Sequence, residues 1–111
     1  MNNIRLIING GKSNIADIDD KWAELTLLKN NKVIAEAGLI IQPDQIYIDT
    51  LNVNSDFRRM GYGTILLDVI KGFSRLFNIM ILADCETEES FLFFMNEKFI
   101  NVCDITVMWI P

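Results

Sequence analysis

Histidine is absent from this sequence of 111 residues. Its absence removes the most frequent general base of enzymes, the most frequent zinc ligand and any nucleophile that depends on a neighbouring imidazole. We therefore expect no bound metal, and no hydrolase built on a Ser-His or Cys-His pair.

Cysteine is scarce and long apolar runs are missing. The two cysteines, Cys85 and Cys103, lack a CxxC spacing, and a chain of this size folds without disulfides, so a reducing, cytoplasmic setting is expected. The most apolar stretches, near residues 76–83 and 91–95, fall far short of the roughly 20 residues that a membrane span requires. The first residues also lack the pattern of a signal peptide. We expect no membrane partner.

Basic residues are fewer than acidic ones. The chain has 10 Lys and Arg against 15 Asp and Glu, which gives a net charge of −5. This charge repels a phosphate backbone, so nucleic acid is not expected as a partner. Half of the residues are apolar, which suits one globular domain covering residues 1–111.

The first half of the chain has the pattern of an antiparallel meander. Asn30 and Asn31 lie between two apolar runs and tolerate the positive φ angles of a tight hairpin. Residues 9–21 are polar and rich in turn formers, which predicts a loop. The predicted strands of this half cover residues 4–8, 22–28, 33–41 and 46–53.

The apolar spacing changes to three and four residues between Tyr62 and Phe77, which predicts a helix with a broad buried face. An apolar strand over residues 79–83 follows it, so this strand and strand 46–53 should run parallel in a right-handed βαβ unit. Thr87 can cap a second helix over residues 88–98. A last strand over residues 105–110 is expected to close the sheet.

The expected fold class is therefore α/β (α+β). We expect a mixed, mostly antiparallel sheet of about five to seven strands, with a central parallel βαβ unit and two main helices.

The residues between strand 46–53 and the first helix carry the clearest chemical signal. Gly61 and Gly63 let the backbone approach a ligand closely, and the first-turn amides of the helix point outward unpaired. Arg58 and Arg59 add positive charge in an otherwise acidic protein. A strand, a basic glycine loop and a helix start together predict a site for a di-anion such as a pyrophosphate.

This segment resembles motif A of the GNAT N-acetyltransferase superfamily, which runs Leu-x-Val-x-Pro-x-aromatic-Arg-x-x-Gly-x-Gly and continues Ser/Thr-x-Leu-Leu. A later family motif, Asn-x-x-Ala-x-x-Phe-Tyr-x-x-x-Gly-Phe, is met more loosely. The matching residues of the first motif are Leu51, Val53, Phe57, Arg58, Gly61, Gly63, Thr64, Leu66 and Leu67, with Ser55 where proline is common, and those of the second are Thr87, Ser90, Phe93, Phe94 and Phe99.

The resemblance implies a GNAT-like fold that binds acetyl-CoA as the acyl donor. It implies that residues 51–53 hold the pantetheine arm and that residues 58–64 hold the pyrophosphate. The cofactor-binding residues expected on this basis are Leu51, Asn52, Val53, Arg58, Arg59, Met60, Gly61, Tyr62, Gly63, Thr64, Thr87 and Phe94.

Three departures from the family pattern bear on function. Phe94 stands where the family often has the tyrosine that protonates the leaving thiolate, and phenylalanine has no proton to give. Thr87 replaces an asparagine, and Lys98 replaces a glycine. The helix pair that lines the acceptor site in this family has no room between Ile8 and Trp22, so the acceptor side should be open.

Amine acylation needs a base, and without histidine only carboxylates are available. Asp49 is the first candidate, because alternation along the strand places it on the same face as Leu51 and Val53 and because family members often carry an acidic residue there. Asp84 and Glu86 are second candidates, since ligands gather at the carboxyl ends of parallel strands. Cys85 lies in the same place, and we expect it to be buried rather than to act as an acid.

The sequence thus predicts an acetyl-CoA-dependent N-acetyltransferase that transfers an acetyl group directly, in a ternary complex, to a primary amine. An open acceptor side favours an amine on a protein, a lysine or an N-terminus, over a small enclosed amine. The alternative, for which Phe94 speaks, is an acyl-CoA-binding regulatory module without turnover. A third hypothesis is a structural interaction domain that pairs through a sheet edge. If strand 105–110 is an exposed edge, a homodimer could complete the site.

Overall fold

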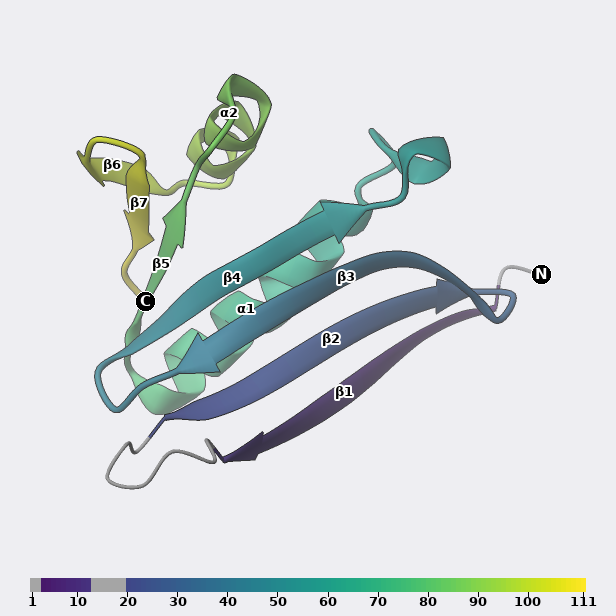
Figure 1. The fold of residues 1–111 in the computed structure, drawn as a ribbon, viewed down its shortest axis with the longest axis horizontal. Helices are drawn as coiled ribbons and strands as arrows, with labels where there is room; N and C mark the ends of the chain where they lie inside the picture. Colours follow the sequence, from purple (N-terminus) through teal and green to yellow (C-terminus); the bar gives the residue numbers. More distant parts are fainter. Residues whose placement is uncertain (1–2, 13–19) are drawn as a thin grey trace.

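The computed structural model describes residues 3–12 and 20–111 (Figure 1). These residues form a seven-stranded sheet in the order β1-β2-β3-β4-β5-β7-β6. The strands are β1 (Ile4–Lys12), β2 (Lys21–Lys29), β3 (Lys32–Ile41), β4 (Gln45–Val53), β5 (Met80–Asp84), β6 (Ile100–Cys103) and β7 (Thr106–Trp109), and the helices are the short 3-10 turn η1 (Ser55–Phe57), α1 (Tyr62–Phe77) and α2 (Glu88–Asn96). The predicted fold class, a mixed sheet with two main helices, is confirmed.

The antiparallel meander covers β1 to β4. Asn30 and Asn31 have φ angles of 52° and 66°, as the hairpin between β2 and β3 requires. The predicted loop was wrong over residues 9–12, because β1 continues to Lys12 beside β2. Glycine suits position 11 of this strand, because a Cβ there would lie 3.0 Å from the indole of Trp22. The remainder of that predicted loop, residues 13–19, lies outside the described residues.

Helix α1 has the predicted bounds and lies behind β3 and β4 in Figure 1. Leu66, Leu67 and Ile70 of α1 are fully buried in the core that the helix forms with the sheet. The helix ends at Asn78, whose φ of 55° is left-handed, and whose amide donates to the carbonyl of Ser74. The core thus fixes the beginning of α1, with its glycines, at the far end of β4.

The parallel pairing of β4 with β5 is confirmed and short. It runs from Gln45 beside Met80 to Ile48 beside Ala83. Beyond this point β4 stays paired with β3 up to Val53, whereas β5 turns away with β7 and leads into α2. Figure 1 shows the two strands parting, with α2 on the β5 side of the opening and the turn η1 at the end of β4 on the other side.

The end of the chain departs from the prediction. Strand β7 is interior rather than a closing edge: it pairs with β5 through Trp109 beside Ile81, and with β6 on its other side. Trp109 is covered by two cations of α1, with Lys71 at 5.3 Å and Arg75 at 5.0 Å from the ring. In the part of the chain that the structure describes, the edges are β1 and β6, so the homodimer hypothesis loses the exposed edge on which it rested.

Two smaller features complete the fold. Helix α2 ends at Asn96 instead of Lys98, because the chain turns at Lys98 with a φ of 73°. No helix of residues 3–12 and 20–111 is long and apolar enough to cross a membrane.

The two cysteines differ in exposure, which generates a labelling prediction. Cys85 is buried and Cys103 is exposed. Burial raises the pKa of the Cys85 thiol; a hydrogen bond with Ser90 lowers it in part, and the negative charge of Asp84 raises it further. We expect the native protein to react with a maleimide at Cys103 more than about tenfold faster than at Cys85, because thiolate content and access both favour the former. Mass spectrometry of timed samples measures this. The Cys103→Ser variant should label only after denaturation, and rapid labelling of it would contradict the packing of Cys85.

Candidate functional site

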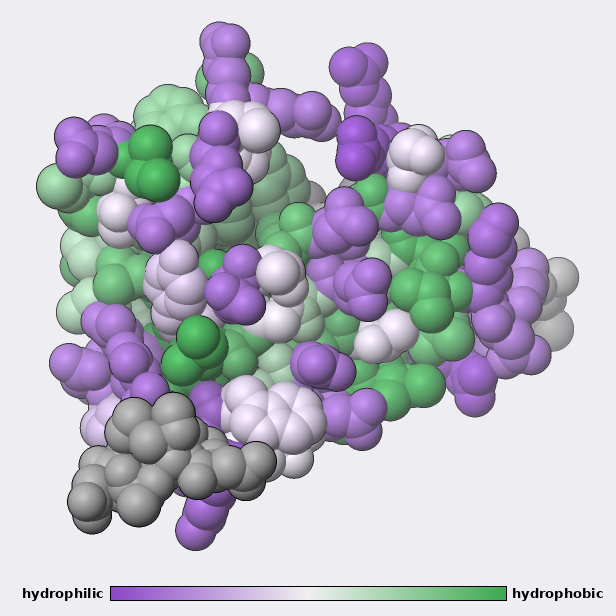
Figure 2. Space-filling view, viewed as in Figure 1, coloured by the Kyte–Doolittle hydropathy of each residue, from purple (hydrophilic) through white to green (hydrophobic). Residues whose placement is uncertain are grey.

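A cleft of about 670 Å³ opens where β4 and β5 separate. Figure 2 shows it as a notch at the upper edge of the molecule, between the side chains over α2 and those over η1. Its lining comes from the end of β4, the loop before α1, the first turn of α1 and one side of α2. The lining residues are Leu51, Asn52, Val53, Phe57, Arg58, Arg59, Gly61, Tyr62, Gly63, Thr64, Thr87, Glu89, Ser90, Phe93 and Phe94.

The structure therefore brings the predicted cofactor residues together, with the exception of Met60. Met60 is not part of the lining and is 61% exposed. The residues of the lining that had not been chosen as site residues are Phe57, Glu89, Ser90 and Phe93. Three of them belong to the quoted motifs, which was a signal for including them. Glu89 has no such signal, because its position depends on how α2 lies against the cleft.

The start of α1 is an uncapped helix end that faces the cleft. Gly61 occupies the N-cap position with a φ of 84°, and no side chain accepts a hydrogen bond there. A left-handed cap of this kind favours glycine. The amides of the first turn, from Tyr62 to Thr64, are the groups that a helix leaves without internal partners. They combine with the partial positive charge of the helix to suit an anion.

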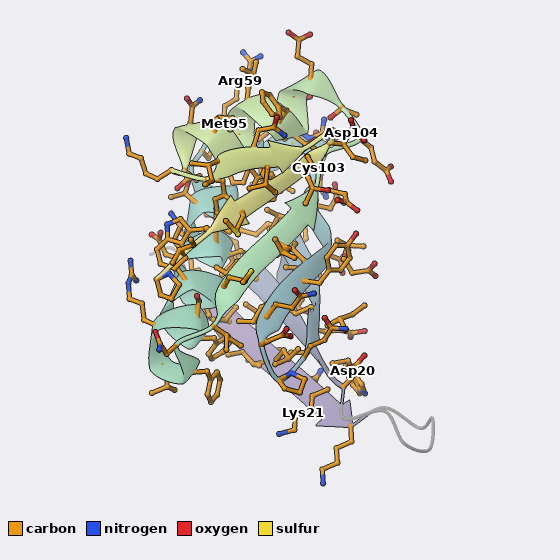
Figure 3. The ribbon with its side chains drawn as sticks, turned by 90° about the vertical axis from the view of Figure 1, so that its left-hand side faces the viewer. Asp20, Lys21, Arg59, Met95, Cys103 and Asp104 are labelled. Atoms are coloured by element: carbon orange, nitrogen blue, oxygen red, sulfur yellow. The ribbon has the colours of Figure 1, made fainter. Side chains whose placement is uncertain are left out.

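The loop before α1 aims its arginines at the same place. Asn54 caps η1 by accepting from the amide of Asp56 at 3.1 Å. Arg58 is anchored by the hydrogen bond from its Nε to the carbonyl of Val53 at 3.2 Å, which leaves the other guanidinium nitrogens for a ligand. Arg59 has a φ of 64° and its side chain is exposed. Figure 3 shows Arg59 at the same end of the molecule as Met95 of α2. The cleft thus has a cationic rim in an acidic protein.

Helices α1 and α2 meet closely at Gly63. A Cβ built on Gly63 would lie 3.3 Å from the ring of Phe93 and 3.6 Å from Cγ2 of Val53. A side chain here would fill the floor of the cleft, which gives this glycine a packing reason as well as a backbone one. At this point the space between α1, Phe93 and Val53 leaves no room for a side chain larger than that of glycine.

A polar clamp holds the end of α2 against α1. The hydroxyl of Thr64 donates to Oε1 of Glu97 at 2.5 Å. Lys71 donates to the carbonyl oxygen of Glu97 at 2.7 Å, and its Nζ lies 3.8 Å from Oε2. Both side chains are largely buried, so this pair is weakly screened by solvent. Thr64 therefore takes part in positioning the helices through its side chain and faces the cleft through its backbone.

The two remaining predicted cofactor residues belong to α2. The hydroxyl of Thr87 accepts from the amide of Ser90 at 3.1 Å, and Oγ of Ser90 accepts from the amide of Thr87 at 3.3 Å, which forms a capping box. Phe94 is buried and packs edge-on against Phe93 and Phe99, with ring centroids 5.3 and 5.0 Å apart. Thr87 therefore has a structural partner of its own, and Phe94 is an apolar wall of the cleft.

A β-bulge changes the position of Asp49. The pairing of β3 with β4 moves from Leu39 beside Ile48 to Gly38 beside Thr50, so Asp49 has no partner. Ile48 before the bulge and Leu51 after it both pack on the core, while Asp49 is exposed. The expectation that Asp49 shares the face of Leu51 was wrong, because one inserted residue reverses the alternation.

Tyr47, on the opposite sheet face, contacts Asp84 and is affected by the charges of the other two candidate carboxylates. The hydroxyl of Tyr47 donates to Oδ2 of Asp84 at 2.9 Å. This hydrogen bond is the main cause that raises the pKa of Tyr47, followed by partial burial and by the negative charges of Asp84, Asp49 and Glu86. None of the three carboxylates lines the cleft. They lie just past the point where the parallel strands part.

The comparisons with known proteins agree with this architecture. The model of the acetyltransferase (GNAT) family matches residues 11–92. Among solved structures, Ard1 from Thermoplasma volcanium is 18% identical, with a TM-score of 0.71, over 78% of this chain and 69% of that one. The anti-CRISPR protein AcrVA5 is 21% identical, with a TM-score of 0.62, over 68% of this chain and 90% of that one.

A third similar structure is a mutant of the AtaT toxin, bound to the C-terminus of the antitoxin AtaR and to acetyl-CoA. It is 15% identical, with a TM-score of 0.65, over 80% of this chain and 67% of that one. No curated protein matches the chain. At these identities the solved structures establish the fold alone.

The hydrogen bond between Tyr47 and Asp84 generates a titration prediction. Replacing Asp84→Asn removes the negative charge that disfavours tyrosinate, so the raised pKa of Tyr47 should fall toward its usual value of about 10. A spectrophotometric titration of tyrosinate measures it, in a Tyr62→Phe background that leaves Tyr47 as the only tyrosine. The control is Asp104→Asn, which removes one exposed charge at another turn. Equal titration curves for the two variants would contradict the hydrogen bond.

Proposed function

The chain belongs to the acetyltransferase (GNAT) family, and we propose that it transfers an acetyl group from acetyl-CoA to a primary amine. The observation that carries this proposal is the cleft between the parted strands, which has an uncapped helix start and two arginines at one end. These are the groups that a pyrophosphate requires. The AtaT mutant of similar fold, whose structure includes acetyl-CoA, supports the same donor.

The cleft fits an elongated thioester in one direction. The first-turn amides of α1, with Arg58 and Arg59, would hold the pyrophosphate. From there residues 51–53 lead back along β4, and their edge toward β5 has no strand partner, because the parallel pairing ends at Ile48. The amides of a pantetheine arm would pair with that free backbone edge. The acyl end would then lie toward Asp49, near the point where the strands part.

The proposed reaction requires no covalent intermediate on the protein. The family substrate, acetyl-CoA, supplies the activated acyl group, and the chain must hold it beside the amine and remove one proton. The candidate bases are Asp49, Asp84 and Glu86, and their common effect on the pKa of Tyr47 supports this choice. Phe94 cannot protonate the departing thiolate, so in this proposal the proton comes from water.

The acceptor would approach from the sheet face opposite α1. In Figure 1 that face is turned to the viewer, and within residues 3–12 and 20–111 no helix lies across it. Figure 2 shows that it carries mixed polar and apolar side chains, and Trp22 is 42% exposed. Because such a face offers few walls to a small amine, we propose an amine on a protein, a lysine or an N-terminus, as the acceptor.

The second candidate function is an acyl-CoA-binding regulatory module. It is favoured by Phe94, whose buried ring faces the cleft where the family often has a tyrosine. In that case acetyl-CoA binds and no amine is acetylated.

The close approach at Gly63 predicts that a larger side chain there weakens acetyl-CoA binding while the protein still folds. We expect Gly63→Val to weaken acetyl-CoA binding by about tenfold or more, which is about 1.4 kcal/mol, because the added methyl groups fill the floor of the cleft against Phe93. The matched control is Gly72→Val in the same helix, where a Cβ meets nothing within 4 Å. Isothermal titration calorimetry with acetyl-CoA measures both, and circular dichroism checks that each folds. Equal affinities would place the acyl donor elsewhere.

Formation of an acetylated amine distinguishes the transferase from the binding module. The wild-type protein is incubated with acetyl-CoA and each of three amines: an N-acetylated peptide with one lysine, a lysine-free peptide with a free N-terminus, and spermidine. The acetylated products are detected by mass spectrometry, since the exposed Cys103 would react with a disulfide reagent. We expect transfer to at least one peptide in preference to spermidine. Binding of acetyl-CoA without transfer would favour the module, and absence of binding would overturn both functions.

A further inference from the structure

One carboxylate at the parting of β4 and β5 is held on both of its oxygens. Asp84 is the last residue of β5. Its Oδ2 accepts a hydrogen bond from the phenol of Tyr47 on β4 at 2.9 Å, and its Oδ1 accepts one from the hydroxyl of Thr106 on β7 at 2.6 Å. The two donors come from the strands on either side of β5. The carboxylate is thus fixed by three neighbouring strands.

Such an arrangement does more than satisfy a surface aspartate. An exposed carboxylate is satisfied by water, whereas hydrogen bonds from two side chains also restrict its rotamer. Each oxygen keeps a lone pair for a further donor. In the part of the chain that the structure describes, no side-chain hydrogen bond holds Asp49 or Glu86 in this way. Of the three candidate bases, Asp84 is the one with a fixed position.

The position of Asp84 suits the proposed path of the substrates. Ala83 is the last residue of β5 that pairs with β4, so Asp84 is the first residue beyond the parting. Ala83 and Ile81 point into the core, which places Asp84 on the open face, opposite α1. The acyl end of a donor that lies along residues 51–53 would reach this parting from one side. An amine on the open face would reach it from the other.

We propose that Asp84 accepts the proton of the acceptor ammonium, and that Tyr47 and Thr106 are positioning residues that hold its carboxylate in place. The inference rests on the proposed transferase function and deepens it. It assigns to Asp84 a role for which Asp49 was the first candidate, because the bulge leaves Asp49 without the shared face that recommended it.

The step balances without any further reactant. The ammonium gives one proton to the carboxylate of Asp84 and becomes a neutral amine. Its nitrogen attacks the thioester carbonyl, a C–N bond forms, and the C–S bond breaks with the electron pair leaving on sulfur. The second nitrogen proton passes through water to the thiolate, and Asp84 returns its proton to solvent. The products are the acetylated amine, CoA thiol and one proton.

The charges that surround Tyr47 agree with this role. The phenol contacts Asp84 of β5, and the negative charges of Asp49 on its own strand and of Glu86 after β5 also act on it. The resulting rise in the pKa of Tyr47 keeps the phenol protonated, and therefore a donor to Asp84, through the neutral range. The same negative charges attract an ammonium to the open face.

The test compares kcat and KM for transfer from acetyl-CoA to the lysine peptide, the N-terminal peptide and spermidine. Asp84→Asn should lower kcat by about 100-fold or more, the range typical of a lost general base. Tyr47→Phe should lower kcat by about tenfold and change the KM for each amine less than about twofold, because the carboxylate loses one of the two donors that hold it in position. Thr106→Val should resemble Tyr47→Phe, whereas Thr106→Ser, which keeps the hydroxyl, should retain the wild-type kcat.

The controls separate this inference from the function on which it rests. The affinity for acetyl-CoA should change less than about twofold in each variant, since none of these residues lines the cleft, and Asp104→Asn should behave as wild type. If wild type transfers acetyl groups and Tyr47→Phe and Asp84→Asn keep its kcat, the inference is overturned and the transferase stands. If wild type binds acetyl-CoA and acetylates none of the three amines, both are overturned.

Discussion

The short parallel pairing of β4 with β5 is the constraint on which the rest of this molecule depends. Four residues of each strand are paired, from Gln45 beside Met80 to Ile48 beside Ala83. Parallel strands need a crossover helix, and that helix, α1, begins beside the end of β4. Because β5 then turns away with β7, a free backbone edge, a helix start and an open wedge come together at one place. The cleft is a consequence of how soon the two strands part.

Packing between the helices keeps the wedge open to a defined width. Gly63 permits α1 to approach Phe93 of α2, and the rings of Phe94 and Phe99 fill the space beneath. Two turns further along α1, Lys71 donates a hydrogen bond to Glu97 at the end of α2. Apolar contacts and a largely buried ion pair therefore act on the same two helices. A cleft fixed in this way needs little reorganisation when a ligand enters, which favours binding.

The two faces of the sheet have opposite electrostatic characters at the parting. The cleft side has helix amides and the guanidinium groups of Arg58 and Arg59, which suit an anion. The open side has Asp84 beside Tyr47, and the charges of Asp49 and Glu86 act on the same phenol, so this side suits a cation. In a protein with a net charge of −5, the two arginines thus make one end of the cleft locally positive. The strands between these faces are where an anionic donor and a cationic acceptor would meet.

Much of the fold and of the donor cleft could be predicted from the sequence. The three- and four-residue spacing gave the bounds of α1, and Thr87 marked the start of α2. The glycines and arginines before α1 identified the cleft, and the predicted residues that line it are close in sequence. These features depend on local backbone chemistry: which residues permit a left-handed φ, cap a helix or leave amides free.

Other features were decided by tertiary structure, because they depend on which distant strands pair and in which register. The bulge at Asp49 arises from the register between β3 and β4, and no local sequence pattern around that residue predicts it. The apolar run of β7 likewise did not predict its place between β5 and β6. That place brings Thr106 to one oxygen of Asp84, and the pairing of β4 with β5 brings Tyr47 to the other. The sequence by itself determined the elements and the anion-binding loop, whereas only the pairing of strands far apart in the chain decided which carboxylate is held at the parting.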